Sequence, residues 1–283
     1  MGRGLKPGPD AAQPLTRTKH GGAPSFAVYH LWNARFMWPY PRIIAHRGAG
    51  RLAPENTLAA MRLAQRHGLT MVEYDVALSR DEMPIVLHDQ NIQRTSNGQG
   101  NADELNFSEL SRFDFGSWHS SAYAGEPLAT LYSIAAFTLA NDMHSNIEIK
   151  PQPGREALTG GLVADLASIL WKDASVPPLL SSFSETALQA ARDAAPELPR
   201  ALLLEGRPGT DWLERLKRLD CMALHLAQAH MSHDLINAVH GKGYKIAAWT
   251  VNDSSRAQRL LQWSCDAVFT DAIDTLPHAL QLT

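Results

Sequence analysis

Three acidic residues have the spacing of a metal site built from carboxylate oxygens. Glu73 and Asp75 lie two residues apart in the apolar run 71–78, and Glu148 lies in the run 146–150. Because residues i and i+2 of a strand share a face, Glu73 and Asp75 are predicted to point the same way. Three carboxylates aimed into one opening repel one another unless a cation lies between them. Oxygen ligands of this kind favour a hard divalent ion, Mg²⁺ or Ca²⁺, over zinc.

Two histidines and two basic residues complete a set that suits an anionic phosphodiester. His46 and Arg47 are consecutive at the end of the first apolar run, while His88 ends a later run. Lys150 lies two residues beyond the third carboxylate. Two imidazoles that titrate near neutrality can share proton transfer as general base and general acid. Each residue alone is compatible with a structural role, but burying so many unpaired charges would destabilise a fold by several kcal/mol.

Nine short runs of strand-forming residues alternate with stretches of helical period, which is typical of parallel βα units. The link between the second and third runs has only five residues, too few for a crossover, so this pair is predicted to be a hairpin. The other eight runs predict a (β/α)₈ TIM barrel. The nine runs are 42–46, 71–78, 84–88, 146–150, 178–181, 200–204, 222–226, 244–251 and 267–270.

The hairpin register and the domain limits follow from the same pattern. A turn at about Asp81 and Glu82 is expected to place Asp75 opposite His88. The barrel is expected to span residues 37–283 as a single domain. Residues 89–127 do not fit the repeat and are expected to form a small inserted subdomain after the third strand. This insertion is either a wall over the site or a packed loop without substrate contact.

The amino-terminal residues and the bulk composition narrow the class of protein further. Residues 1–36 are rich in glycine, proline and basic residues, which predicts a disordered extension, and we hypothesise that translation starts at Met37. The formal net charge of -3 and the absence of a basic stripe argue against a nucleic-acid partner. Cys221 and Cys265 are isolated, as expected in a reducing compartment. No apolar run has the length of a membrane span, so a cytoplasmic protein without stable membrane association is expected.

Ten segments, taken together, resemble the glycerophosphodiester phosphodiesterase family, and most of all its small cytosolic bacterial members. The resemblance runs from about Trp38 to the C-terminus. The matching segments are His46-Arg47-Gly48, Pro54-Glu55-Asn56-Thr57, Glu73-Tyr74-Asp75-Val76, His88-Asp89, Arg94-Thr95 with Gly98, Asn146-Ile147-Glu148-Ile149-Lys150-Pro151, Glu197-Leu198-Pro199-Arg200, Leu224-His225-Leu226, Trp249-Thr250-Val251-Asn252 and Thr270-Asp271.

The resemblance implies a TIM barrel of the phospholipase-C-like phosphodiesterase type and a role for each candidate residue. His225 and Trp249 end later strands and look like pocket residues that contact phosphate or glycerol, with packing at the barrel rim as the alternative. Two departures from the family pattern lie in the hairpin, where Ser79 replaces a threonine and Glu82 replaces a glycine. The implied roles are acid/base catalysis for His46 and His88, metal binding for Glu73, Asp75 and Glu148, and phosphate binding for Arg47 and Lys150.

The implied activity is hydrolysis of glycerophosphodiesters, such as glycerophosphocholine and glycerophosphoethanolamine, to sn-glycerol 3-phosphate and an alcohol. One divalent cation, Mg²⁺ or Ca²⁺, is the implied cofactor, and attack by the substrate's own glycerol hydroxyl would give a cyclic intermediate that water opens. One alternative is a lysophospholipase D or phospholipase-type enzyme acting on a lipid, for which the aromatic residues of the insertion would provide membrane contact. Another is a non-catalytic glycerophosphodiester-binding sensor, against which the presence of both histidines counts.

Overall fold

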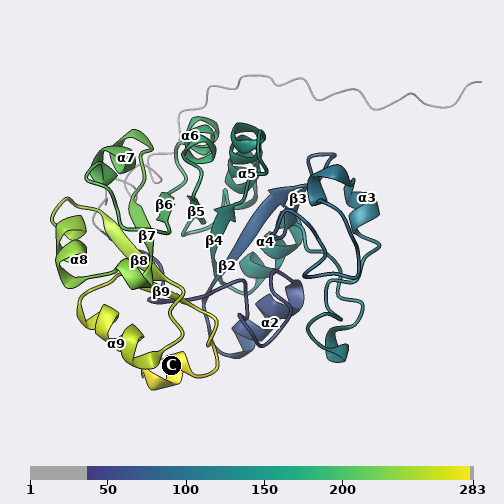
Figure 1. Ribbon diagram of the computed structural model, residues 1–283, viewed down its shortest axis with the longest axis horizontal. Coiled ribbons are helices and arrows are strands. Elements are labelled where there is room, and N and C mark those ends of the chain that lie inside the picture. The colour runs from purple at the N-terminus through teal and green to yellow at the C-terminus, as the bar shows by residue number, and fades with distance from the viewer. Residues whose placement is uncertain (1–36, 281–283) are drawn as a thin grey trace, which may run out of the picture. The chain divides into compact units, whose positions relative to one another are not determined.

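Eight parallel strands are hydrogen-bonded in a closed ring in the computed structural model, which describes residues 37–280. The first strand pairs with both the second and the last, and this closes the ring (Figure 1). The predicted TIM barrel is therefore confirmed. The strands of the ring are β1 (Ile43–Ala45), β2 (Met71–Leu78), β4 (His144–Ile149), β5 (Leu179–Ser182), β6 (Arg200–Leu204), β7 (Ala223–Ala227), β8 (Lys245–Trp249) and β9 (Ala267–Thr270).

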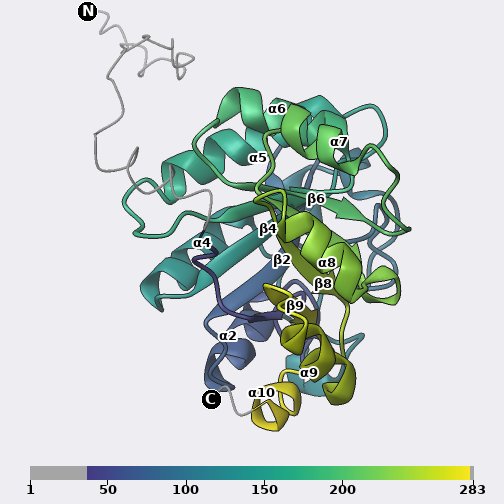
Figure 2. The ribbon, with the colours of Figure 1, turned by 90° about the vertical axis from the view of Figure 1, so that its left-hand side faces the viewer.

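Helices cover the outside of the ring (Figures 1 and 2). Five of them begin where a side-chain oxygen accepts a hydrogen bond from the backbone N–H three residues on, at Thr57, Thr130, Ser184, Ser232 and Asp253. The helices are α2 (Leu58–Arg66), α4 (Leu131–Ala140), α5 (Glu156–Leu170), α6 (Glu185–Ala194), α7 (Trp212–Arg218), α8 (His233–His240), α9 (Ser254–Gln262) and α10 (Leu276–Ala279).

Apolar side chains fill the space on both sides of the barrel wall. The larger cluster lies between strands and helices, and a smaller one, rich in alanine from β6 to β9, lies inside the ring. Trp38 and Tyr40 pack against the inner cluster with their rings 5.1 Å apart. The Tyr40 hydroxyl donates to the carbonyl of Pro177, just before β5, so these aromatic residues close the amino-terminal end of the barrel. The opposite end is left for polar residues.

The short strand β3 (Pro84–Val86) runs antiparallel to β2 and lies outside the ring. Val76 pairs with Val86, and Leu87 N–H donates to the carbonyl of Asp75. Leu87 therefore lies opposite Asp75, and the predicted pairing of Asp75 with His88 is wrong by one residue. The cause is the turn, which holds five residues between Leu78 and Pro84 rather than an even number. His88 lies beyond the end of β3, so this shift does not turn its side chain away from the barrel opening.

Glu82 in this turn adopts the left-handed conformation, with a φ of 63°. That conformation costs a residue with a Cβ roughly 1–2 kcal/mol, a cost that glycine avoids. We expect Glu82→Gly to raise the free energy of unfolding by about 1 kcal/mol, as measured by urea denaturation. Glu82→Ala also removes the carboxylate but keeps the Cβ, so it serves as the control and should leave stability almost unchanged. Equal effects of the two substitutions would contradict this explanation.

Residues 89–127 lie between β3 and α4, beside β3 (Figure 1). They contain α3 (Phe107–Leu110) and two short 3₁₀ helices, η1 (Ala102–Glu104) and η2 (Ser121–Tyr123). The segment has a core of its own, which it shares with β3 and the end of β2. Its buried members are Ala77, Ile85, Leu87, Ile92, Ala102, Leu110, Phe115 and Leu128.

The same segment also contacts the loop between β1 and α2. The Tyr123 hydroxyl donates to the carbonyl of Leu52, and a carboxylate oxygen of Glu126 accepts from the Ala59 N–H. The insertion is therefore fixed to the carboxyl end of the barrel.

No helix within residues 37–280 is long and apolar enough to cross a membrane.

Candidate active site

The three predicted carboxylates converge at the carboxyl ends of β2 and β4. Asp75 pairs with Glu148 in the sheet register, and Glu73 lies two residues before Asp75 on the same strand. Each offers an oxygen within 4.8 Å of the others. Glu73 and Asp75 are almost fully buried, while the Glu148 side chain is 12% exposed. Both the spacing and the burial fit the predicted cluster.

Mutual repulsion and burial change how these carboxyls titrate. Burial, followed by the charges of Asp75 and Glu148, raises the pKa of Glu73 well above its ordinary range. Burial and Asp75 raise the pKa of Glu148 to about 7. Burial also tends to raise the pKa of Asp75, but the cations around it prevail and lower that pKa. Burial and repulsion thus favour the neutral forms of Glu73 and Glu148, and a bound cation would oppose both effects.

These carboxylates fit a hard divalent cation on geometry and chemistry. Oε1 of Glu73 is buried and accepts no hydrogen bond from the described residues, 37–280. Its second oxygen accepts from the Arg47 backbone N–H at 2.8 Å. One free buried oxygen, with two more carboxylates beside it, is the ligand set that Mg²⁺ or Ca²⁺ accepts. Asp75 is fixed by Asn56, whose side chain donates to its carboxylate and accepts from its backbone N–H.

The loop after β1 presents His46 and Arg47 through an unusual backbone path. Arg47 and Gly48 have φ angles of 51° and 87°, both in the left-handed region. A Cβ on Gly48 would approach the Cβ of Ala60 to 2.8 Å, so only glycine fits there. The turn places Nε of the Arg47 side chain 3.5 Å from Asp75 and one of its terminal nitrogens 2.8 Å from Glu55. A cation thus lies beside the carboxylate cluster.

His46 is oriented by an aspartate from the other end of the chain. Its Nδ1 lies 2.7 Å from a carboxylate oxygen of Asp271, just after β9, and its Nε2 lies 3.9 Å from Glu73. The second oxygen of Asp271 accepts from Asn252. Because hydrogen bonds to His46 and Asn252 outweigh the effect of burial, the pKa of Asp271 is lowered. An ionised carboxylate can only accept, so Nδ1 of His46 carries a proton and Nε2 faces the cluster.

His88 has the same arrangement with a neighbour in sequence. Its Nδ1 lies 2.7 Å from Asp89, whose pKa is lowered to about 2 by hydrogen bonds from Arg94 and then His88. Nδ1 therefore donates, and Nε2 is free to accept from Lys150 at 3.3 Å. Burial, followed by the nearby cations, lowers the pKa of His88, so the neutral imidazole is favoured. Both histidines point Nε2 at the same opening.

Lys150 links the polar site to an aromatic rim. Its ammonium lies 3.2 Å from Glu148 and 5.7 Å from the ring centre of Phe183. Phe183 packs edge-to-face on Trp249, with ring centres 5.5 Å apart. Trp249, a predicted pocket residue, is thus near the site and carries a buried indole N–H without a partner among the described residues. Phe183 is 42% exposed and was not identified from the sequence.

His225, the other predicted pocket residue, is not brought to this opening. Its side chain is completely buried, and its ring contacts are with Phe269 at 4.9 Å and Trp38 at 6.5 Å. Neither ring nitrogen has a hydrogen-bond partner within the described part of the chain. Burial lowers its pKa to about 3, so this imidazole is neutral. Its surroundings are those of barrel packing.

Four residues with a direct part in this geometry were given no role on sequence grounds. Asp89 and Asp271 orient the histidines, Asn56 fixes Asp75, and Glu55 pairs with Arg47. Glu55 also accepts hydrogen bonds from both terminal nitrogens of Arg94, a residue of the insertion. The signal for Asp89 and Asp271 was an acid directly after a strand-end residue, whereas Glu55 and Asn56 lie in a loop with no periodic pattern.

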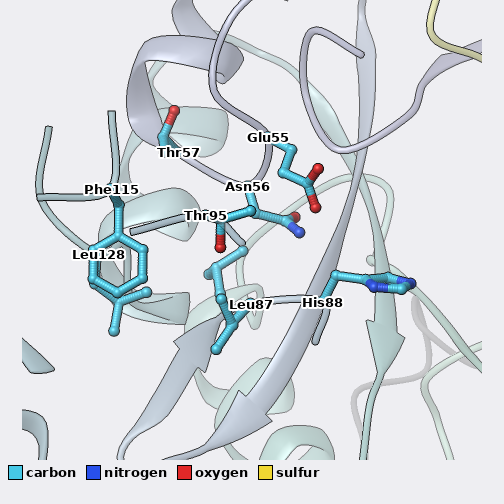
Figure 3. A pocket seen from close by; sticks show the side chains of 9 residues that line it. Glu55, Asn56, Thr57, Leu87, His88, Thr95, Phe115 and Leu128 are labelled. Atoms are coloured by element: carbon cyan, nitrogen blue, oxygen red, sulfur yellow. The ribbon is translucent and has the colours of Figure 1, made fainter. Parts of the chain in front are cut away.

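A small pocket lies beside Glu55 and Asn56, with a volume of about 220 Å³ including open solvent. Its apolar wall is formed by Leu87, Phe115 and Leu128 (Figure 3).

A closed parallel barrel that gathers carboxylates, two oriented imidazoles and two cations at its carboxyl end belongs to the class of TIM-barrel proteins equipped for acid–base chemistry on an anionic substrate. The profile of the glycerophosphoryl diester phosphodiesterase family matches residues 46–275. The chain belongs to this family. It is 30% identical over 238 residues to a glycerophosphodiester phosphodiesterase of Caldanaerobacter subterraneus, covering 83% of this chain and 95% of that relative.

Solved structures agree with this assignment. A phosphodiesterase of Oleispira antarctica, in complex with the product sn-glycerol-3-phosphate, is 34% identical with a TM-score of 0.81. The match covers 90% of this chain and 99% of that one. A glycerophosphodiester phosphodiesterase of Agrobacterium tumefaciens is 25% identical with a TM-score of 0.71, over 84% and 99% of the two chains.

Proposed function

We propose that this enzyme hydrolyses small glycerophosphodiesters, such as glycerophosphocholine, to sn-glycerol 3-phosphate and an alcohol, with one bound Mg²⁺ or Ca²⁺. The observation that carries the proposal is the pair of imidazoles, each with Nδ1 on an aspartate and Nε2 directed to the opening that holds three carboxylates. Residues 37–283 would form the single catalytic domain. The two cysteines, both buried free thiols, are consistent with a cytoplasmic location.

Glu73, Asp75 and Glu148 would hold the cation, with Asn56 keeping Asp75 in place. When bound, the cation supplies a positive charge that stabilises negative charge growing on the phosphoryl oxygens. Arg47 and Lys150 add two further positive charges, one beside Asp75 and the other beside Glu148. In the absence of substrate they pair with carboxylates, so a phosphate entering the site would compete for them.

The histidines would carry the protons of a two-step reaction. In the first step one imidazole accepts the proton of the glycerol hydroxyl that attacks phosphorus, while the other protonates the departing alcohol oxygen as its bond to phosphorus breaks. In the second step water opens the cyclic phosphate and the two imidazoles exchange tasks. Asp271 and Asp89 keep Nδ1 protonated, so that Nε2 alone takes part in proton transfer.

The aromatic pair Phe183 and Trp249 would contact a part of the substrate beside the phosphate. Phe183 is exposed at the rim, and the Trp249 indole N–H is free to donate to a hydroxyl. We assign His225 to the packing of the barrel interior rather than to substrate binding, because its side chain is completely buried.

The first test is release of glycerol 3-phosphate from glycerophosphocholine by the purified protein. We expect activity that EDTA removes, that Mg²⁺ or Ca²⁺ restores, and that His46→Ala lowers by about 10²–10⁴-fold. Lysophosphatidylcholine is assayed in parallel to detect lipid hydrolysis. Binding of glycerophosphocholine without turnover would overturn the proposal in favour of a sensor, and turnover of the lipid alone would overturn it in favour of a phospholipase-type activity.

A further inference from the structure

Arg94 of the insertion bridges two carboxylates of the active site. Its two terminal nitrogens donate to the two oxygens of Glu55 at 2.7 and 2.8 Å, and its Nε donates to Asp89 at 2.6 Å. Glu55 accepts a further hydrogen bond from Arg47, and Asp89 accepts one from His88. The guanidinium of Arg94 therefore links Arg47, which would bind phosphate, to His88, which would transfer a proton.

The geometry of this bridge requires arginine rather than a positive charge alone. A guanidinium is planar and presents parallel donors that match a carboxylate, and its Nε remains available for a second acceptor. Arg94 uses both features, one on Glu55 and the other on Asp89. A lysine ammonium could reach one carboxylate but could not hold the two in a fixed relation.

Figure 3 shows the imidazole of His88 and the carboxylate of Glu55 on one side of the pocket, with Phe115 and Leu128 on the other. Leu87, next to His88, belongs to the core of the insertion. The His88 backbone is thus tied to the insertion through packing, and its side chain is tied to the same segment through Asp89 and Arg94. Both attachments depend on residues 89–127.

We propose that Arg94 is a positioning residue, through which the insertion holds Asp89 against His88 and keeps the imidazole in its reactive orientation. This inference rests on the proposed function of the site. Arg94 acts on His88 through Asp89 and does not touch the reacting atoms. The insertion thereby contributes to catalysis through a side chain that orients a group at the reacting centre.

The exposure of Arg94 separates this role from a purely structural one. Its side chain is 44% exposed, so water can reach the carboxylates that its loss would leave unpaired, and this limits the cost to the free energy of unfolding. A misplaced catalytic group, by contrast, costs one to two orders of magnitude in rate. Loss of Arg94 is therefore expected to affect turnover far more than stability.

The test compares Arg94→Ala and Arg94→Lys with Arg112→Ala, which removes an exposed arginine of the same insertion. We expect both Arg94 variants to lower kcat by about 10- to 100-fold, with KM changed less than about threefold and Tm almost unchanged. Free guanidinium, added well below denaturing concentration, should restore part of the turnover of Arg94→Ala. Arg112→Ala should match the wild type.

A second readout does not depend on turnover. Nitrogen-15 NMR of the histidine side chains, assigned with His88→Gln and His46→Gln, reports which ring nitrogen carries the proton and how firmly it is bonded. We expect Arg94→Ala to shift or broaden the Nδ1–H signal of His88 and to leave that of His46 in place. This result would stand even if the assays for the proposed function found no turnover.

Three results would overturn the inference. A rise in KM with kcat unchanged would make Arg94 a substrate contact. A fall in Tm that accounts for the lost activity would make it a structural residue. An unchanged His88 signal in Arg94→Ala would show that Asp89 holds the imidazole without help.

Discussion

His88→Gln is expected to lower kcat by about 10³-fold while leaving KM and the fold nearly unchanged, because general acid–base catalysis contributes about 10²–10⁴-fold. Glutamine keeps a polar group of similar reach but cannot exchange a proton near neutral pH. Steady-state kinetics with glycerophosphocholine measure the loss. Circular dichroism and Tm report whether the barrel is intact.

His240 supplies a matched control for this substitution. It forms an imidazole–carboxylate pair with Asp266 at the same distance, 2.7 Å, and with a similar side-chain exposure of 28% against 30% for His88. Asp266 precedes β9, so this pair lies at the amino-terminal end of the barrel. His240→Gln should retain full activity. Equal losses in the two variants would mean that His88 acts through the fold rather than through proton transfer.

Glu148→Gln should stabilise the metal-free protein at pH 8 and at the same time abolish metal-dependent turnover. Folding raises the pKa of Glu148 from its ordinary 4.5 to about 7. A carboxyl whose pKa is raised stabilises the fold below pH 4.5, and this stability is lost as the pH rises through about 7. The rise corresponds to at most about 4 kcal/mol, because a tenfold change in the acid dissociation constant is worth roughly 1.4 kcal/mol. Glutamine removes the ionisation and hence the loss.

Thermal unfolding in EDTA between pH 5 and pH 8 measures this effect. The wild type should lose several degrees of Tm over this range, and Glu148→Gln should lose less. Saturating Mg²⁺ or Ca²⁺ should reverse the order at pH 8, because only the wild type gains a full ligand set. Glu185 is the control, since burial tends to raise its pKa but its pairs with Arg218 and Arg215 lower it. Glu185→Gln should therefore destabilise at pH 8, and stabilisation by both variants would contradict the explanation.

Much of the fold could be predicted because each barrel strand is a short apolar run between stretches of helical period. All nine runs contain a strand, and only their ends differ, as at β4, which begins at His144 rather than Asn146. The hairpin register could not be derived in the same way. It depends on how Ser79 and Met83 close the turn, which the alternation of side chains leaves undetermined.

The site residues likewise include some that the sequence predicts and others that it does not. Glu73 and Asp75 share a face by strand periodicity alone, so their convergence could be predicted. The partners that fix the site lie in loops, such as Asn56 on Asp75 and Asp271 on His46, across 19 and 225 residues of chain. No local pattern reports such contacts. His225 shows the converse, since a strand-end histidine in sequence is buried among aromatic rings in space.

The pairing of β1 with β9 also bears on how this enzyme is made. A ribosome releases β1 and His46 early and β9 and Asp271 last, so neither the ring nor the His46–Asp271 pair can form until nearly the whole chain has emerged. Contacts between such distant segments form slowly because a long loop must first be closed. Until then the nascent chain exposes the unpaired edges of β1 and its neighbours. Closure of the ring is therefore expected to be a late event in the synthesis of this enzyme.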